Sequence, residues 1–171
     1  WGFKAFAPKL IRHGEGGHIV NTSGLMGLQV SARGGVGPYA GSKFGVVALS
    51  VGMEEAMAPY GIGVSVLCPG PTRTTAYLAH EVRPDRFGGP FEREIPESHL
   101  RAVSNGMDPD LVGLMVLEGI RNDDFFILTH PSAGPLIQEW HDRIMRGVAR
   151  AAEIRAQLGI PDDAGLIRPR P

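Results

Sequence analysis

Apolar side chains recur along the chain with two different periods, and these periods predict alternating helices and strands. The first pattern is a spacing of three and four residues, which marks one face of a helix. It places a helix at the start of the chain, over Trp1–Ile11, with apolar or small residues at Phe3, Phe6, Ala7, Leu10 and Ile11. The stretch His18–Thr22 is short, rich in β-branched residues and preceded by glycines, so it predicts a buried strand.

A second helix and a second strand follow. Pro38 suits the first turn of a helix, where its missing N–H has no intrahelical partner to lose, and this helix is expected to run to about Pro59. The apolar run Val64–Cys68 predicts another buried strand, which the sequence Pro69-Gly70-Pro71 ends. The glycine-rich segment Ser23–Gly37 between strand and helix is expected to be a long loop.

The second half of the chain begins with an irregular segment, Thr72–Asn105, with short helices expected near Thr75–Val82 and Pro96–Ser104. Asp108 and Pro109 are typical of a helix start, and apolar positions continue this helix to Ile120. The remaining expected elements are a third strand over Phe125–Thr129, whose apolar residues are assigned to the core, a long helix over Gly134–Leu158, and a loose tail over Gly159–Pro171.

Strands that alternate with helices of crossover length predict a doubly wound α/β fold: a parallel, Rossmann-like sheet with flanking helices. We expect one domain over residues 1–158. Ligands of such sheets bind at the carboxyl ends of the strands. Two polar, glycine-containing segments, Ser23–Gly37 and Pro69–Thr75, begin there, so a site is expected between them.

Composition narrows the class of protein. The chain has 171 residues, 43% of them hydrophobic, and a formal net charge of -1, so it can form a core but has no basic surplus for nucleic acid. Its single cysteine, Cys68, excludes an internal disulfide and a zinc site built on several cysteines. There is no apolar run of about 18 residues and no signal-peptide pattern, so we expect a cytoplasmic protein without a membrane segment.

The segment Tyr39-Ala40-Gly41-Ser42-Lys43 carries the strongest chemical signal. Residues four apart at the start of a helix share one face, so the Tyr39 and Lys43 side chains are expected to rise together. A free tyrosine loses its proton only near pH 10, and a neighbouring ammonium favours the phenolate. A Y-x-x-x-K spacing alone is also typical of an ordinary amphipathic helix, so its surroundings decide the interpretation.

Three runs, Gly17–Ser23, Gly37–Val46 and Val64–Thr74, occur in an order and at intervals that resemble the active-site half of the short-chain dehydrogenase/reductase family. The resemblance covers the chain from Trp1 to about Thr75 and returns more weakly over Asp108–His130. It implies an oxidoreductase that uses NAD or NADP to transfer hydride between the nicotinamide and an alcohol or carbonyl substrate.

By this resemblance, Tyr39 exchanges a proton with the substrate oxygen, and Lys43 activates Tyr39 and binds the nicotinamide ribose. The Pro69-Gly70 turn, Thr72 and Thr74 would hold the carboxamide end of the nicotinamide, and Tyr39 and Lys43 would also belong to the cofactor site. No metal is expected. The aromatic and aliphatic residues of the variable segment favour a small or medium apolar alcohol or ketone: Tyr77, Leu78, Phe87 and Phe91.

One residue of the family pattern is displaced. The pattern N-x-S-S-x-x-G appears as Asn21-Thr22-Ser23-Gly24-Leu25-Met26-Gly27, so the serine that usually hydrogen-bonds the substrate oxygen falls on Gly24. Its usual interval to the tyrosine would instead reach Met26, so the loop is longer than is common. Ser23 is the candidate to replace it, with Ser31 a weaker one. Two alternatives stay open: Ser23 acts from the neighbouring position, or the role is vacant.

The family's glycine-rich diphosphate loop has no counterpart after any strand of this sequence. We therefore expect the chain to be the C-terminal, catalytic part of a longer dehydrogenase, and to bind NAD or NADP poorly by itself. The intact protein is expected to be a homo-oligomer that associates through the helices Trp1–Ile11 and Pro38–Pro59. The alternative is a degenerate, non-catalytic relative that serves as a scaffold or binding module.

Other reactive residues fit structural roles better. His18 begins a strand and His130 precedes Pro131 in an expected turn. Cys68 lies in an expected buried strand, where a thiol behaves as a small apolar side chain. The remaining histidines and carboxylates lack the spacing of a metal cluster.

Overall fold

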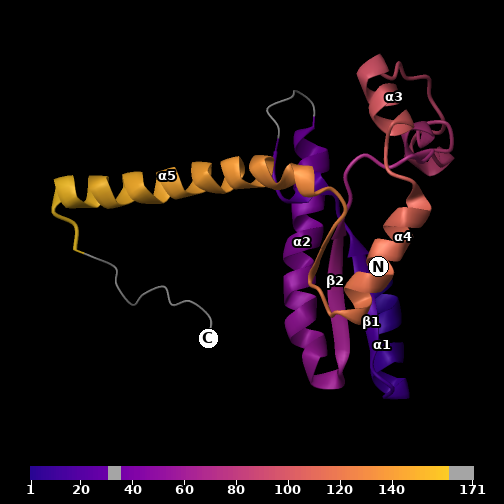
Figure 1. The fold of residues 1–171 in the computed structure, drawn as a ribbon, viewed down its shortest axis with the longest axis horizontal. Helices are drawn as coiled ribbons and strands as arrows, with labels where there is room; N and C mark the ends of the chain where they lie inside the picture. The colour runs from indigo at the N-terminus through magenta and orange to yellow at the C-terminus, as the bar shows by residue number, and fades with distance from the viewer. Residues whose placement is uncertain (31–35, 162–171) are drawn as a thin grey trace. The chain divides into compact units, whose positions relative to one another are not determined.

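The computed structural model of the chain describes residues 1–30 and 36–161. Its main elements follow the predicted order (Figure 1). They are α1 Gly2–His13, β1 Gly17–Thr22, α2 Gly37–Met57, β2 Ile62–Cys68, α3 Glu97–Ser104, α4 Pro109–Arg121, β3 Phe126–Leu128 and α5 Gly134–Leu158. One-turn 3-10 helices lie at Leu25–Gly27, Ala58–Tyr60, Ala76–Leu78, Asp85–Phe87 and Pro131–Ala133. Ser31 and the tail residues 162–171 lie outside the described residues.

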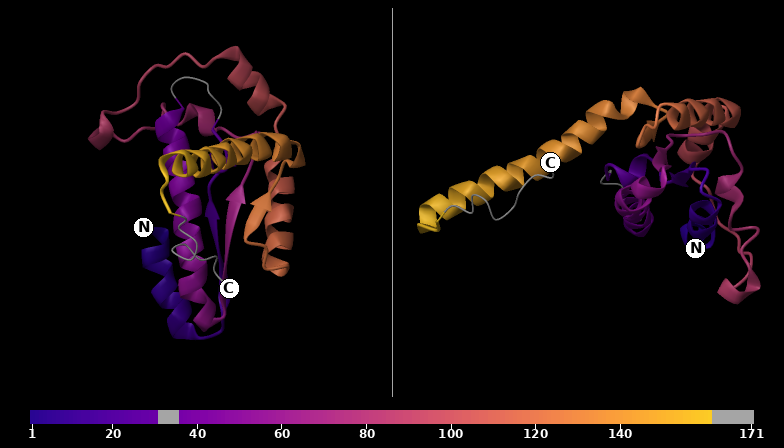
Figure 2. Two further views of the ribbon diagram at one scale, coloured as in Figure 1. Left: turned by 90° about the vertical axis from the view of Figure 1, so that its left-hand side faces the viewer. Right: turned by 90° about the horizontal axis from the view of Figure 1, so that it is seen from below.

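The sheet of the described residues has three parallel strands in the order β1-β2-β3, and Figure 2 (left) shows their arrows pointing the same way. Val20 of β1 pairs with Ser65 of β2, and Leu67 of β2 pairs with Ile127 of β3. The predicted fold class, a parallel Rossmann-like sheet with flanking helices, is therefore confirmed. Because the strands are parallel, their carboxyl ends share one edge of the sheet.

Apolar side chains cover both faces of the central strand, β2. On one face, α1 and α2 pack on β2 through Ala7, Met57, Ile62 and Val64. On the other face, α4 packs on β2 and β3 through Leu67, Val112 and Ile127. Figure 2 (right) shows α4 on the opposite side of the strands from α1 and α2. The alternation of Val64 and Leu67 between the two clusters follows from the two-residue period of a strand.

Local signals explain where the elements start and stop. The Asp108 side chain accepts a hydrogen bond of 2.9 Å from the Asp110 N–H, and it caps α4 as its sequence predicts. Gly61 adopts a left-handed conformation at φ 64 and turns the chain from the 3-10 helix after α2 into β2.

The prediction that all of Phe125–Leu128 lies in the core is wrong. Only Ile127 is buried, at 4% exposure, whereas Phe126 and Leu128 are 46% and 39% exposed. Alternate residues of a strand point to opposite faces, and α4 covers only the face that Ile127 shares. The apolar run Phe125–Leu128 therefore belongs to a strand that α4 covers on one face only.

The chain divides into two compact units, Trp1–Ala133 and Gly134–Pro171, and the sheet belongs to the first. In the second unit, none of the residues of α5 is buried. The assignment of residues 1–158 to one domain stays a prediction. Within the described part of the chain, no helix combines the length and the apolar character that crossing a membrane requires.

Candidate active site

Tyr39 and Lys43 lie in the first turns of α2, the helix that follows β1 and its loop. The Lys43 ammonium lies 5.5 Å from the centroid of the Tyr39 ring, so the two side chains share one face of the helix as their spacing predicts. The tyrosine is 54% exposed, and the ammonium donates a long hydrogen bond of 3.5 Å to the Thr22 carbonyl at the end of β1. An ammonium has three N–H donors, so this pair keeps donors for a ligand.

Gly24, which lies in the loop after β1, faces the tyrosine. A Cβ atom built on Gly24 would lie 3.9 Å from the Tyr39 hydroxyl and 3.9 Å from the Pro69 carbonyl oxygen. The backbone of Gly24 is extended, with φ 162, a conformation that any residue adopts. The position can therefore hold a larger side chain, and that side chain would point toward the tyrosine hydroxyl.

Ser23 is turned away from this opening. It is 2% exposed, and its hydroxyl donates a hydrogen bond of 2.9 Å to the Lys43 carbonyl in α2. Gly27 approaches the same place: a Cβ there would clash with the Ser23 hydroxyl and would lie 2.8 Å from the Lys43 carbonyl oxygen. The hydroxyl of Ser23 thus ties the loop to the backbone of α2.

Cys68 is the last residue of β2, and its side chain is fully buried. Burial raises the pKa of this thiol, while hydrogen bonds from the Gly24 backbone and the Ser23 side chain and the charge of Lys43 oppose that rise. A buried thiol with a raised pKa stays protonated near neutral pH, so Cys68 acts as a buried apolar side chain and not as a nucleophile.

The Pro69-Gly70 turn is fixed by the neighbouring strand ends. The Pro69 carbonyl accepts a hydrogen bond of 3.1 Å from Leu25 N–H, and the Gly70 N–H donates one of 3.1 Å to the Thr129 hydroxyl. Thr72 donates from its hydroxyl to the Gly70 carbonyl at 3.1 Å. The turn therefore lies between the loop after β1 and the end of β3.

Thr74 lies farther along the same segment, where its hydroxyl accepts a weak hydrogen bond of 3.4 Å from the Ala76 N–H. Sequence reasoning placed Thr72 and Thr74 at the site but did not connect Thr129 or His130 to it. The sequence signal that could have identified Thr129 and His130 is their position at the end of an expected strand.

A second polar cluster lies near the amino ends of the strands. His18 Nε2 lies 2.7 Å from the Ser65 hydroxyl, and His18 Nδ1 lies 3.7 Å from Asp123 Oδ1. The residue types resemble a nucleophile, a base and an acid. However, Ser65 is fully buried and donates its hydrogen to the Asp124 carbonyl at 2.6 Å. The cluster therefore joins β1, β2 and the turn before β3, with no substrate access.

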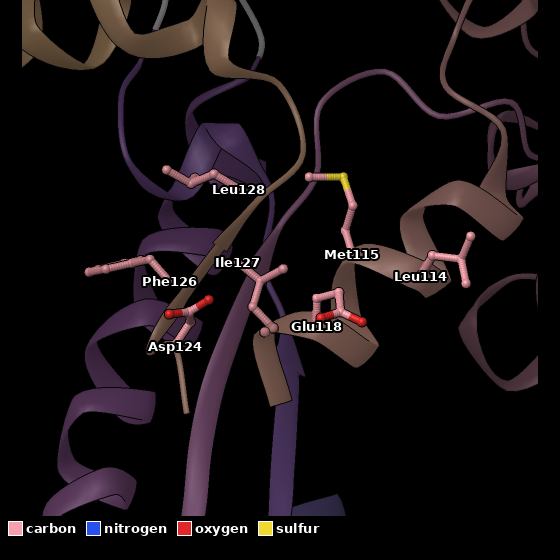
Figure 3. A pocket seen from close by; sticks show the side chains of 8 residues that line it. Leu114, Met115, Glu118, Asp124, Phe126, Ile127 and Leu128 are labelled. Carbon is pink, nitrogen blue, oxygen red and sulfur yellow. The ribbon is translucent and has the colours of Figure 1, made fainter. Parts of the chain in front are cut away.

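An apolar hollow of about 420 Å³ opens along α4 and β3 (Figure 3). It contains neither Tyr39 nor Lys43, so it is separate from the candidate active site. Its lining is Leu114, Met115, Glu118, Gly119, Asp124, Phe126, Ile127 and Leu128. Among residues 1–30 and 36–161, no three histidine, cysteine or acidic side chains gather as metal ligands would.

Comparison with known proteins identifies the family of the chain. Residues 1–85 match the family model described as short chain dehydrogenase. The chain is 29% identical over 151 residues to a C alpha-dehydrogenase of Sphingobium sp., and 30% identical over 166 residues to a CLA biosynthesis dehydrogenase/reductase of Lactiplantibacillus plantarum. These alignments cover 86% and 89% of the chain.

Among solved structures, the fold is similar to a short chain dehydrogenase/reductase from Burkholderia phymatum in complex with NAD. The TM-score is 0.76 at 29% identity, and the match covers 85% of this chain and 54% of that one. The chain spans about half the length of the curated relatives it matches, 49% and 55%.

Proposed function

The chain belongs to the short-chain dehydrogenase/reductase family, and from this premise we propose that Tyr39 and Lys43 are the catalytic pair of an NAD(P)-dependent alcohol or ketone oxidoreductase. The observation that carries the proposal is the half-exposed Tyr39 side chain, whose hydroxyl faces Gly24, with the Lys43 ammonium 5.5 Å from the Tyr39 ring.

The residues at this edge suit a nicotinamide nucleoside. Tyr39 and Lys43 offer O–H and N–H donors to a ribose diol, and the Pro69-Gly70 turn with Thr72 and Thr74 offers polar groups to a carboxamide. NAD and NADP share this part, so either nucleotide fits these residues. When bound, such a nucleotide would supply or accept the hydride of the reaction.

Each catalytic residue has one physical task. In the reducing direction, the Tyr39 hydroxyl would give its proton to the substrate oxygen as the substrate carbon gains hydride, and in the oxidising direction it would take that proton back. The Lys43 ammonium would stabilise negative charge on the tyrosine oxygen. Exposure of Tyr39 leaves room for a substrate oxygen at hydrogen-bond distance.

The substrate we propose is a small or medium apolar alcohol or ketone. The segment after the Pro69-Gly70 turn offers Tyr77 and Leu78, both half-buried, and the exposed rings of Phe87 and Phe91. Arg83 lies 5.5 Å from the Phe91 ring and Arg86 lies 4.9 Å from the Phe87 ring, so the proposal of an uncharged substrate rests on these four apolar side chains and not on an absence of charge.

The decisive experiment is Tyr39→Phe in the complete protein that contains these residues. Because the change removes only the hydroxyl, we expect turnover of secondary alcohols and ketones, followed by nicotinamide absorbance, to fall by about 10²–10⁴-fold. Tyr60→Phe is the matched control, since Tyr60 is a half-exposed tyrosine at the far end of α2. Near-normal turnover of Tyr39→Phe, with an unchanged unfolding midpoint, would show that the proton carrier is another group.

A second candidate function, a non-catalytic scaffold, is favoured by one observation: Gly24 offers no hydroxyl where the family pattern has a serine. The same experiment separates the two. A scaffold would give no turnover above background with either nucleotide, in the unchanged protein as in the Tyr39→Phe variant.

We further propose that the intact protein is a homo-oligomer through α1 and α2. Both helices expose large apolar side chains beside the faces they bury, such as Phe6 at 61% and Leu49 at 63%. Burial of such side chains between copies is favourable. Sedimentation of the complete protein, with Leu49→Glu as the disrupting variant, measures the association.

A further inference from the structure

The peptide between Pro69 and Gly70 is held on both sides. Its carbonyl oxygen accepts from Leu25 N–H at 3.1 Å, and its N–H donates to the Thr129 hydroxyl at 3.1 Å. The two groups of one trans peptide point in opposite directions, so these two bonds fix the orientation of the whole peptide plane. One bond comes from the loop after β1 and the other from the residue that follows β3.

The Thr129 hydroxyl, which accepts from Gly70, also contacts His130. Thr129 is 1% exposed, and its hydroxyl oxygen lies 2.7 Å from His130 Nδ1. A threonine hydroxyl has one hydrogen and two lone pairs. One lone pair of the Thr129 hydroxyl accepts from the Gly70 N–H, so the hydroxyl hydrogen can point to the imidazole. The bond from Gly70 thereby orients the Thr129 hydroxyl.

The imidazole also packs directly on Gly70. A Cβ atom at Gly70 would lie 2.6 Å from His130 Cγ and 2.6 Å from His130 Nδ1, which is closer than two side chains can approach. The backbone of Gly70 is not left-handed. Glycine is therefore required here because the histidine ring fills the space of a side chain.

We propose that Thr129 and His130 are positioning residues of the nicotinamide subsite, which act by fixing the plane and the place of the Pro69–Gly70 peptide. The inference rests on the proposed function, because it assigns the turn to the cofactor. It goes beyond the proposed function because it assigns the geometry of the turn to two residues at the end of β3. These residues lie outside the region that carries the family motifs.

The first test needs no cofactor. Thr129→Val keeps the shape of the side chain but removes the acceptor for Gly70 N–H, whereas Thr129→Ser keeps the hydroxyl. We expect the Gly70 amide of the complete protein to exchange with deuterium at least about tenfold faster in Thr129→Val, because its exchange is then no longer limited by that bond. Thr129→Ser should restore the slow exchange. Equal exchange in all three proteins would overturn the role of Thr129.

The second test asks whether the hydrogen bond from Gly70 to Thr129 contributes to cofactor binding. In the complete protein we expect Thr129→Val to raise the KM for the active nucleotide by roughly tenfold and to change kcat by less than threefold, with Thr129→Ser close to the unchanged protein. Equal KM values in Thr129→Val and the unchanged protein, at a faster Gly70 exchange, would overturn the link to the nicotinamide.

His130 is tested by two amides. Asn at position 130 can present its side-chain oxygen where Nδ1 lies, and Gln can reach the place of Nε2. If His130 acts through Thr129, His130→Asn should keep the KM within about threefold while His130→Gln and His130→Ala raise it. Rescue by Gln and not by Asn would mean direct contact with a ligand and would overturn the positioning role.

The two proposals fail in different ways. If the unchanged protein turns over no alcohol or ketone with either nucleotide, the proposed function fails, while the hydrogen-exchange result still decides whether Thr129 and His130 hold the turn. If turnover is normal and the variants match the unchanged protein in KM and in exchange, only the present inference fails.

Discussion

Gly24 and Tyr39 face one another: a Cβ atom on Gly24 would lie 3.9 Å from the tyrosine hydroxyl. The neighbouring Ser23 instead gives its hydroxyl hydrogen to the Lys43 carbonyl at 2.9 Å. Of the two alternatives that the sequence left open for the displaced serine, this geometry favours a vacant role at Gly24. It also identifies the position at which a hydroxyl could be restored.

Gly24→Ser should increase turnover in the complete protein. The serine hydroxyl would reach toward the Tyr39 hydroxyl, where we propose that the substrate oxygen binds, and a donor aimed at a developing oxyanion is commonly worth about 10²–10³ in rate. We expect an increase in kcat of at least about threefold, measured by nicotinamide absorbance with the best alcohol or ketone found. Gly24→Ala is the control, since it adds the same carbon without the hydroxyl.

Ser23→Ala tests the other alternative. If Ser23 took part in catalysis, its loss would lower kcat by about 10²–10³. We expect instead a small effect on kcat and a loss of stability of about 0.5–1.5 kcal/mol, since the hydrogen bond between the loop and α2 is lost while the Lys43 carbonyl, inside α2, keeps the hydrogen bond of the helix. A large fall in kcat at unchanged stability would return the catalytic role to Ser23.

Lys43→Met should lower both the rate and the affinity for the nucleotide. Methionine has a similar length and no charge, so it removes the ammonium that we propose stabilises the tyrosine oxygen and hydrogen-bonds the nucleotide. We expect kcat/KM to fall by about 10²-fold or more, and equilibrium binding of the nucleotide to weaken in parallel. Lys9→Met, at an exposed lysine on α1, should leave both unchanged. An unchanged affinity in Lys43→Met would limit Lys43 to activation of the tyrosine.

Gly27→Ala should distort the site. The new Cβ would lie 2.8 Å from the Lys43 carbonyl oxygen, a backbone atom that cannot turn aside as a side chain can. The loop or α2 must then shift, at a cost of about 1–3 kcal/mol for overpacking. Chemical denaturation of the complete protein measures this cost. Gly24→Ala, with its nearest neighbours at 3.9 Å, should leave the denaturation midpoint close to that of the unchanged protein.

Ser65→Ala should destabilise the fold without touching the site. The buried hydroxyl donates to the Asp124 carbonyl at 2.6 Å and lies 2.7 Å from His18 Nε2, so its loss leaves two polar groups without their partner. The expected loss is about 1–3 kcal/mol. Ser104→Ala is the matched control, because Ser104 makes a similar side-chain to backbone bond of 3.1 Å on the surface. Equal denaturation midpoints of the two variants would contradict the role of this cluster.

Element order and fold class were predictable from the sequence, because their causes are local. The spacing of Phe3, Ala7 and Leu10 requires neighbours only along α1, and Asp108 caps α4 through a residue two places away. The pairing of Tyr39 with Lys43 is local as well, since one helical turn joins them. For these reasons the strands, the helices and the face shared by this pair agree with the expectations.

The tertiary structure decided which side chains face one another and which are covered. Whether Phe126 is covered depends on which helix packs on β3, and whether Ser23 or Gly24 faces Tyr39 depends on how the loop crosses to α2. The need for glycine at position 70 arises from His130, sixty residues away, because the carboxyl ends of β2 and β3 meet at one edge of the sheet. A local pattern carries no information about such contacts, since they form only once the parallel strands are side by side.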